Sequence, residues 1–585
     1  MKVVKTSLDF SMLEGEPHTQ IGLLGVWCLN NCENILKVRE QYNIAIYHWD
    51  DREKYNSDFL YLNQIYENKL AILVPMLNRI HSLDKDIRYW RIIIGPWLRF
   101  FIDAVFDRYE CIRSSQERNK ASSYDLYSYD IYEWCPSDFP EFWDDLTSEE
   151  WNEVIFSECI IHQKIMASQV ERYLKRSNKN TNKDVSFRQK YRDLAKWISS
   201  KYSELIGPKY RGSVVIGAYS SLRATLKLYL KLRQLPYLSL PVITLPDCEV
   251  NKKMRTSLTF GQESLGFEAV FEKLLPAMMP KVYLENFSEL REKIMVKLPE
   301  KPKSIFTANL YQADDVFKIW AADMCSAQVP LFIGQHGGTF SIAEHNQTVD
   351  HQLKIADKFV SWGWDKQGED HIIKLPSMQL AYRSDLAPDP RGQVLHLLTS
   401  LPRYFYCHYS VPVAGQFLSY IDDQLQFFNR LEPTIRKNLR IRPDPTQAAR
   451  GWNVKEMISN AGFGKELDES GGEMLKVIGA SKLCICTSNS TVFLQTLSMN
   501  FPTVVFWDNK YNEISSDAQE YIDLLVASKI LFFNPIEAAQ HVNTIISTID
   551  DWWFSWEVQK NREIFCDRYA FNRADWIDGW SWLFK

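Results

Sequence analysis

A polar turn containing two glycines follows an apolar run in the middle of the chain. In residues 333–340, with the sequence IGQHGGTF, the turn comes directly after a predicted buried strand and before a predicted helix. The carboxyl ends of parallel strands expose such turns to a ligand cleft. Gly337 and Gly338 allow a ligand to approach the backbone closely, the helix N-terminus favours an anion, and His336 can exchange a proton near neutral pH. The pattern predicts a ligand site around Gln335 and His336. The alternative is a tight turn with a hydrogen-bonded structural histidine.

A second polar turn has the sequence TSNST and covers residues 487–491. It lies between the apolar run LCICT and a segment with a helical pattern, VFLQTLSM. Hydroxyl and amide groups at such a junction can cap the helix, and the exposed N–H groups there can hold a phosphate. A ligand loop and a simple helix cap both fit. The residues concerned are Ser488, Asn489, Ser490 and Thr491.

Two further polar groups follow predicted strands. Arg442, in RIRPDP, could pair bidentately with a phosphate or a carboxylate, or form a surface ion pair. In YHWDDR, which begins at Tyr47, Asp50 or Asp51 could orient sugar hydroxyls while Trp49 stacks on a ring face. A capped turn before the next helix is the alternative for this second group.

Alternating strands and helices are predicted to position these groups. In the first half we predict strands at residues 21–27, 44–48, 304–308, 329–333 and from 359, and helices at 58–75, 87–111, 313–327 and 341–356. Pro75 is expected to break or kink the first of these helices. In the second half we predict strands beginning at residues 394, 439, 483 and 503, and helices at 416–429 and from 492.

The pattern predicts an α/β protein with two Rossmann-like domains. Prolines at 376, 388 and 390 mark a boundary, so that residues 1–385 form an N-terminal domain with a helical insertion at about 58–210, and residues 386–550 form a C-terminal domain. The last segment, 551–585, contains six tryptophans and is expected to form helices that pack across both domains.

Composition excludes several classes of protein. The 585 residues are 45% hydrophobic, which excludes a disordered chain, and 68 Lys and Arg against 73 Asp and Glu give a net charge of −5, which does not fit a dedicated nucleic-acid binder. The basic stretch at 171–196 is expected to be a solvated loop.

Eleven cysteines without a CxxC pair favour a reducing compartment and no zinc site. No secretory signal or membrane-spanning run is recognisable, so we predict a cytoplasmic protein, with peripheral contact at the inner face of the membrane left open.

Several long segments resemble bacterial transferases associated with surface-carbohydrate biosynthesis, whose members look like GT-B glycosyltransferases. The resemblance spans most of the chain. The segments that carry it are YHWDDR at Tyr47, LNRIH at Leu77, RYWRIIIGPWLRFFIDAVFDRY at Arg88, IGQHGG at Ile333, IADKFVSWGW at Ile355 and CTSNSTVFLQTLSMNFPTVVFW at Cys486.

The resemblance implies a GT-B-like fold in which the two domains face a cleft. The C-terminal domain would bind a nucleotide-sugar through residues 488–491, with Arg442 facing its phosphates, and the N-terminal domain would meet the acceptor, with His336 near the reacting centre. Many retaining GT-B enzymes carry a pair of glutamates where this chain has Thr487 and Gln495. Glu513 falls where such enzymes often present an acidic residue.

The function that this implies is transfer of a sugar from a nucleotide-sugar to a cell-surface polysaccharide or a lipid-linked glycan, with no cofactor and no metal. His336 or Glu344 would take the acceptor's proton. The alternatives are a nucleotide-sugar epimerase, a polyol-phosphate transferase and a non-catalytic scaffold for glycan assembly. The residues predicted to bind the donor are Arg442, Ser488, Asn489, Ser490, Thr491, Gln495 and Glu513, and those predicted for the acceptor or the cleft are Gln335, Gly337, Gly338, His48, Trp49, Asp50 and Asp51.

Overall fold

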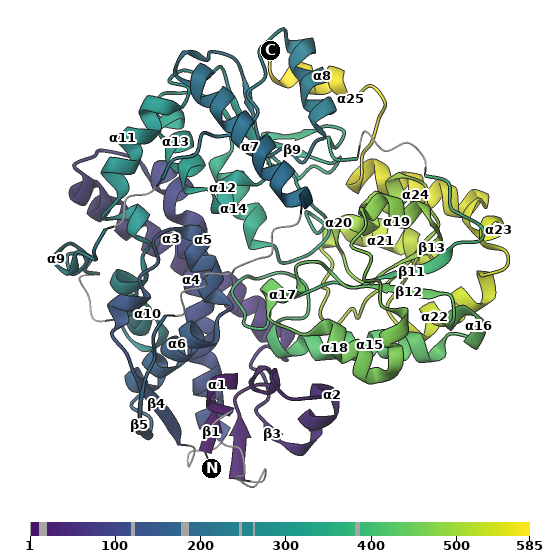
Figure 1. The fold of residues 1–585 in the computed structure, drawn as a ribbon, viewed down its shortest axis with the longest axis horizontal. Helices are drawn as coiled ribbons and strands as arrows, with labels where there is room; N and C mark the ends of the chain where they lie inside the picture. The colour runs from purple at the N-terminus through teal and green to yellow at the C-terminus, as the bar shows by residue number, and fades with distance from the viewer. Residues whose placement is uncertain are drawn as a thin grey trace.

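The computed structural model describes residues 2–10, 20–118, 123–176, 187–244, 248–260, 264–380 and 386–585, and its frame is two five-stranded parallel sheets (Figure 1). In the first sheet the strands lie in chain order: β6 (Val214–Val215), β7 (Ile305–Thr307), β8 (Leu331–Gly334), β9 (Lys358–Ser361) and β10 (Ile372–Lys374). The second contains β11 (Gln393–Leu397), β12 (Leu439–Arg442), β13 (Ser481–Cys486), β14 (Thr503–Phe506) and β15 (Leu531–Phe532).

The second sheet has the strand order β12-β11-β13-β14-β15. Strand β11 pairs with β12 on one side and with β13 on the other. The order in which the chain adds strands therefore reverses direction beside β11. Crevices at the carboxyl ends of strands at such a reversal are where ligands bind in open parallel sheets. Strands β8 and β14 are buried along their whole length, as expected of parallel strands covered on both faces.

Helices connect the strands and cover the sheets. In the first unit these are α8 (Leu222–Leu232), α9 (Lys252–Arg255), α10 (Gly266–Met278), α11 (Phe287–Lys297), α12 (Leu310–Ala313), α13 (Asp315–Ser326) and α14 (Gln347–Ile355). In the second they are α15 (Phe417–Arg430), α16 (Pro433–Arg436), α17 (Gln447–Arg450), α18 (Val454–Ile458), α19 (Met474–Gly479), α20 (Thr491–Ser498), α21 (Ser516–Ala527) and α22 (Pro535–Ile545). The predicted α/β class, with two Rossmann-like units, is confirmed.

The described residues up to 210 form a largely helical unit that accompanies the first sheet. Its elements are β1 (Lys2–Val4), α1 (Ser7–Phe10), β2 (Ile21–Leu23), α2 (Ile35–Val38), β3 (Asn43–Ile44), α3 (Arg52–His81), α4 (Ile87–Arg118), β4 (Tyr124–Ser128), α5 (Phe139–Leu146), α6 (Glu149–His162), β5 (Ala167–Tyr173) and α7 (Phe187–Ile206). Strands β1, β2 and β3 make a separate three-stranded sheet, and β4 pairs with β5. The strand predicted at 21–27 is shorter than expected, because residues 26–29 wind into a 3₁₀ helix that buries Trp27. The strand predicted at 44–48 is also shorter and ends at Ile44.

Two predicted helices have other bounds than expected. Of the break or kink predicted at Pro75, the break is absent: α3 continues to His81, since its buried face packs along α4 and outweighs one missing backbone hydrogen bond. Helix α14 begins at Gln347 and not at residue 341, because Thr339 and Ser341 have positive φ angles of 69° and 58°, which are incompatible with a helix.

Two predicted segments fall partly on residues that are not described. Of the basic stretch at 171–196, residues 177–186 lie outside the described residues, while β5 ends at Tyr173 and α7 begins at Phe187. The domain boundary predicted at 385 lies at residues 381–385, which are also outside them. In the part of the chain that is described, no helix combines the length and the hydropathy required to cross a bilayer.

The last helices of the chain run from the second sheet unit back to the first. Helix α23 (Ile549–Trp553) leads to α24 (Trp556–Tyr569), which packs on α20 and α21. Helix α25 (Trp576–Leu583) lies beside α8 at the top of Figure 1. Between them the Phe571 N–H donates to the Trp362 carbonyl at 3.0 Å, and within α25 the Trp580 indole donates to the Pro376 carbonyl at 2.8 Å. This segment therefore holds together the two units that flank the cavity described next.

Candidate active site between the two sheets

A cavity of about 300 Å³ lies between the two sheet units, at the carboxyl ends of their strands. The first unit contributes the turn after β8, residues 336–340, and the second contributes residues 399–402 after β11 and 487–491 after β13. The Thr487 hydroxyl donates to the Leu397 carbonyl at 2.8 Å, which ties the ends of β11 and β13 together at the reversal of the second sheet. The cavity thus occupies the position where this sheet topology places a ligand.

The two polar turns predicted from the sequence lie against each other across this cavity. The Gly338 N–H donates to Thr491 Oγ1 at 3.1 Å. A Cβ atom on Gly338 would lie only 2.5 Å from the Ser490 carbonyl carbon, so residue 338 has to be glycine for the turns to approach this closely. Residues 336–338 and 488–491 all line the cavity, as one ligand surface.

One end of the cavity suits an anion. Helix α20 begins there, and its N-cap residue Ser490 makes no side-chain capping bond, so a phosphate can meet the N–H groups of the first turn. Arg450 is the one residue with a permanent positive charge among the described residues that line the cavity. Its guanidinium donates to the Tyr406 hydroxyl. Simple side-chain capping, the alternative for this turn, is not what the structure shows.

His336 is a neutral histidine at the cavity wall. Burial lowers its pKa to about 4, although a hydrogen bond to the backbone of Ala308 acts in the opposite direction. Its Nδ1 atom is buried and has no hydrogen-bond partner. A neutral imidazole carries a lone pair on one of its two ring nitrogens. His336 is therefore unprotonated at neutral pH and keeps an acceptor nitrogen.

Polar groups without a partner gather on this cavity. Besides His336 Nδ1, the Ser400 hydroxyl, the Asn489 side-chain oxygen and the Trp507 indole nitrogen are buried and make no hydrogen bond. Buried polar groups are almost always satisfied, so several on one wall indicate a polar ligand or ordered water. Both donors and acceptors are among them, as recognition of a hydroxyl-rich molecule requires.

A carboxyl group with a raised pKa also lines the cavity. Burial, together with repulsion from Asp508 and Asp422, raises the pKa of Asp423 to about 7. Asp508 lines the cavity as well. Asp423 is therefore partly protonated at neutral pH and can both donate and accept hydrogen bonds there.

The structure places several predicted residues away from the cavity. Arg442 pairs with Asp468 at 3.0 Å and with the Gly472 carbonyl, and Glu344 is exposed. Gln335 is buried and holds the turn from behind, because its side-chain oxygen accepts from the Trp362 N–H at 3.0 Å and from the Trp364 indole at 2.7 Å. None of these three residues lines the cavity.

Two further donor-site predictions also lie off the cavity wall. Gln495 is buried within α20. Glu513 accepts from Arg52 at 2.6 Å; burial alone would raise its pKa, but hydrogen bonds from His345 and Arg52 lower it to about 2. Glu513 therefore joins α3 to the second unit as a paired carboxylate.

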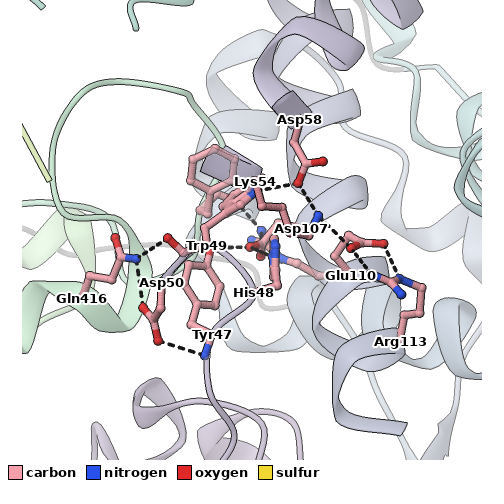
Figure 2. A network of polar contacts seen from close by, with 12 residues as sticks. Tyr47, His48, Trp49, Asp50, Lys54, Asp58, Asp107, Glu110, Arg113 and Gln416 are labelled. Atoms are coloured by element: carbon pink, nitrogen blue, oxygen red, sulfur yellow. Dashed lines mark hydrogen bonds and ion pairs between the residues drawn. The ribbon is translucent and has the colours of Figure 1, made fainter. Parts of the chain in front are cut away.

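The cluster at Tyr47 belongs to the interior and not to the cavity (Figure 2). Trp49 is fully buried among aromatic rings, and His48 bonds Asp107 at 3.1 Å. Asp51 caps α3, and Asp50 accepts from the Gln416 amide at 3.0 Å, as Figure 2 shows. The segment YHWDDR is therefore a capped turn before α3, and its Asp50 also bonds Gln416 of the second unit.

His48, Asp107 and Cys111 are the one group of described residues whose ligand atoms could surround a metal, within 4.8 Å of one another. Asp107 already accepts from His48 and from Arg108 at 2.9 Å. Burial raises the pKa of the Cys111 thiol well above its usual range, which keeps the sulfur protonated. Hydrogen bonding within the protein accounts for this group.

Sequence reasoning missed Arg450, Asp423 and Trp507. Trp507 ends the TVVFW run and could have been found as a side chain at the carboxyl end of a strand. Arg450 and Asp423 lie in helices α17 and α15, where a single charged residue looks like an ordinary exposed one. Only the folded chain brings them to the cavity.

The lowered pKa of His336 predicts that the free energy of unfolding falls in acid. The pKa of His336 is about 4 when folded and about 6.5 when unfolded, so the unfolded chain binds more protons between these values. The contribution of His336 to the free energy of unfolding therefore has its full value above pH 6.5 and is lost as the pH falls towards 4. From pH 7 to 4.5 the unfolding free energy of the wild type should fall by about 2 to 3 kcal/mol more than that of His336→Gln. Urea unfolding at both pH values measures this, and equal losses would contradict it.

Comparison with known proteins adds the following. A family model described as LIC12162 family transferase matches residues 6–584. A comparison with curated proteins finds no match. Among solved structures, the chain is similar to the crystal structure of Acinetobacter baumannii MurG, with 9% identity, a TM-score of 0.32, and coverage of 64% of this chain and 99% of that one. It is also similar to WaaG, a glycosyltransferase involved in lipopolysaccharide biosynthesis, with 10% identity, a TM-score of 0.30, and the same coverage.

Proposed function

The chain belongs to the LIC12162 family of transferases, and on this basis we propose that it moves a sugar from a nucleotide-sugar to a cell-surface polysaccharide or a lipid-linked glycan. The observation that carries the proposal is one cavity with an anion-binding end and a proton-accepting group. The uncapped N-terminus of α20 is the first, and His336 Nδ1 is the second; Arg450 adds a permanent positive charge to the lining of the same cavity.

In the proposed reaction the acceptor hydroxyl attacks the anomeric carbon of the donor. The bond between that carbon and the phosphate oxygen breaks, and its electron pair leaves with the phosphate. Arg450 and the N–H groups of α20 stabilise the negative charge of the leaving phosphate, so the proposal requires no metal ion. The proton of the acceptor hydroxyl passes to His336 Nδ1.

The other polar residues are assigned by their position on the cavity. Ser488 and Asn489 would bind the phosphate or ribose of the donor, and Asp423 would bind sugar or ribose hydroxyls. The cysteines other than Cys248 form no disulfide bond, which agrees with a reducing compartment such as the cytoplasm. A glycan carried by a lipid would be met at the inner face of the membrane.

Nucleotide binding is tested first by thermal shift with UDP, GDP, CDP and CMP. Ligand at about 100 times its dissociation constant should add roughly 2.7 kcal/mol to the unfolding free energy. The matching nucleotide-sugar is then incubated with and without candidate glycans, and the products are identified by mass spectrometry. Nucleotide release that depends on the acceptor supports sugar transfer.

The same assay distinguishes the alternatives. A nucleotide-sugar that is converted to its isomer without an acceptor indicates an epimerase. A CDP-polyol that releases CMP and leaves phosphate on the product indicates a polyol-phosphate transferase. Absence of any nucleotide response, together with normal glycan synthesis in cells that carry His336→Ala, indicates a scaffold.

Arg450 should contribute strongly to binding of the donor's phosphates. Arg450→Gln is expected to weaken binding of the responding nucleoside diphosphate by about 10- to 100-fold, as a charge-assisted hydrogen bond contributes about 1.5 to 3 kcal/mol. Isothermal titration calorimetry measures this. Arg440→Gln is the matched control, because Arg440 pairs with Asp468 away from the cavity. An unchanged affinity in Arg450→Gln would remove Arg450 from the donor site.

A further inference from the structure

A second, smaller cavity of about 40 Å³ lies among helices α3, α4, α12 and α14. About 10 to 15 Å³ is enough for one water molecule, so this volume suits one small chemical group. Gly95 in the middle of α4 keeps it open: a Cβ atom there would lie 2.7 Å from the Tyr66 hydroxyl and 2.9 Å from His351 Cε1. Lys354, whose side chain is 48% exposed, is also one of its lining residues.

Polar atoms without a partner point to a ligand in this cavity. Five of its lining residues carry one each: Tyr66 Oη, Arg99 Nη2, Tyr311 Oη, Gln347 Nε2 and His351 Nε2, all buried. The guanidinium and amide nitrogens can only donate, and the two hydroxyls can donate as well. A group that presents several acceptor oxygens would satisfy these donors, and the proposed catalytic cavity does not use any of them.

Arg99 gives the cavity a buried positive charge. Its side chain is 9% exposed and contacts Asp103 at 3.2 Å, while Nη1 donates to Asn63 Oδ1 at 2.6 Å. These contacts leave Nη2 free to bind one more oxygen. Asp350 and Lys354 are the other charged residues among the described ones that line the cavity.

The charges nearby are balanced without a ligand. Lys354 pairs with Glu67 at 2.7 Å. Glu67 also accepts hydrogen bonds from Nη1 and Nη2 of Arg91, each at 2.7 Å. Asp103 faces His408 at 3.4 Å in addition to Arg99. The unsatisfied donors, and not an excess of charge, therefore define what this cavity can bind.

The small cavity adjoins the large one. Thr348, in the first turn of α14, lines both. Its neighbour Gln347 accepts from the His408 N–H at 2.9 Å and from Arg99 Nε at 3.3 Å, so the first turn of α14 is part of the boundary between the cavities. The proposal places a side group of the acceptor on the Arg99 side of this boundary.

We propose that this cavity is a subsite for an acidic acceptor: it binds one carboxylate or phosphate group of the glycan, with Arg99 Nη2, Gln347 Nε2 and the Tyr311 hydroxyl as donors. The role as part of an acceptor site rests on the proposed sugar transfer. Oxyanion binding itself does not, and it can be measured separately.

The test uses inorganic phosphate and acetate as probes, in the presence of a saturating nucleotide that fills the anion end of the large cavity. At least one probe should raise the melting temperature of the wild type; acetate alone indicates a carboxylate subsite and phosphate alone a phosphate subsite. Tyr311→Phe should leave the melting temperature without probe unchanged, because its hydroxyl has no partner, and should weaken the responding probe about tenfold. Gly95→Ala should abolish the response by filling the cavity.

Tyr237→Phe is the matched control, since it removes another buried hydroxyl without a partner that lies on neither cavity. A wild type that responds to neither probe, or equal responses in the wild type and Tyr311→Phe, overturns the proposal and leaves the cavity to water. If Gly95→Ala does not fold, Tyr311→Phe still decides. The nucleotide response is read in the same samples, and its absence would count against the proposed function and not against this subsite.

Discussion

Replacement of His336 by glutamine is expected to slow sugar transfer by about 10²- to 10⁴-fold and to leave nucleotide affinity close to that of the wild type. Glutamine can keep a donor towards Ala308, but it has no nitrogen that accepts a proton. His336 Nδ1 is the group assigned to take the proton of the acceptor hydroxyl, and it is neutral because burial lowers its pKa to about 4. The loss should therefore fall on kcat.

Rates at saturating donor, together with calorimetric nucleotide affinity, separate the two effects. His541→Gln is the matched control: His541 is also a partly buried histidine whose pKa burial lowers to about 4, but it lies in α22 away from the cavity. Wild-type kcat in His336→Gln would rule out His336 as the base. A loss of nucleotide affinity as large as the loss of rate would assign it to binding.

Gly338→Ala is expected to lower kcat/KM by about 100-fold or more and to destabilise the fold by about 1 to 3 kcal/mol. The new Cβ atom would lie 2.5 Å from the Ser490 carbonyl carbon and 2.6 Å from its oxygen. Those are main-chain atoms, so one of the two turns has to move by roughly 1 Å to restore ordinary contact. A misplacement of this size is known to cost about 100-fold in rate.

Two other glycines calibrate this result. A Cβ atom on Gly337 would meet only the Thr491 hydroxyl, at 2.9 Å, so Gly337→Ala should have a smaller effect. Gly472→Ala places its Cβ atom at an ordinary 3.4 Å from Val477 and should behave as the wild type. Activity and thermal unfolding of the three variants measure the series. If all three retain wild-type activity, the contact between the turns is not needed for function.

Much of the fold could be predicted because the signals that specify it are local. Apolar runs such as LCICT and TVVFW became β13 and β14, and polar residues after them became turns. The break before α14 could not be predicted, since the positive φ angles of Thr339 and Ser341 follow from how the turn packs. Pro75 was expected to break or kink α3, and the helix does not break there because its buried face packs along α4.

Part of the candidate site could be predicted from the sequence and part could not. Both polar turns were recognisable from the residues that precede and follow them, and the structure brings them into contact. Arg450 and Asp423 carry no local signal and were missed, whereas Arg442 and Glu513 carried a plausible one and lie off the cavity. The difference lies in their partners: Asp468 holds Arg442, and Arg52, 461 residues away in the chain, holds Glu513.

Buried strands and the polar turns at their ends can be recognised in the amino-acid sequence, because alternation, apolar runs and glycine act over a few residues. Which of the polar side chains stay available to a ligand depends on the folded chain. A charged or polar group is satisfied by whichever partner the fold brings within about 3 Å, and that partner can come from anywhere in the chain. The atoms that remain without one, at His336 and at Arg99, are therefore known only from the folded protein.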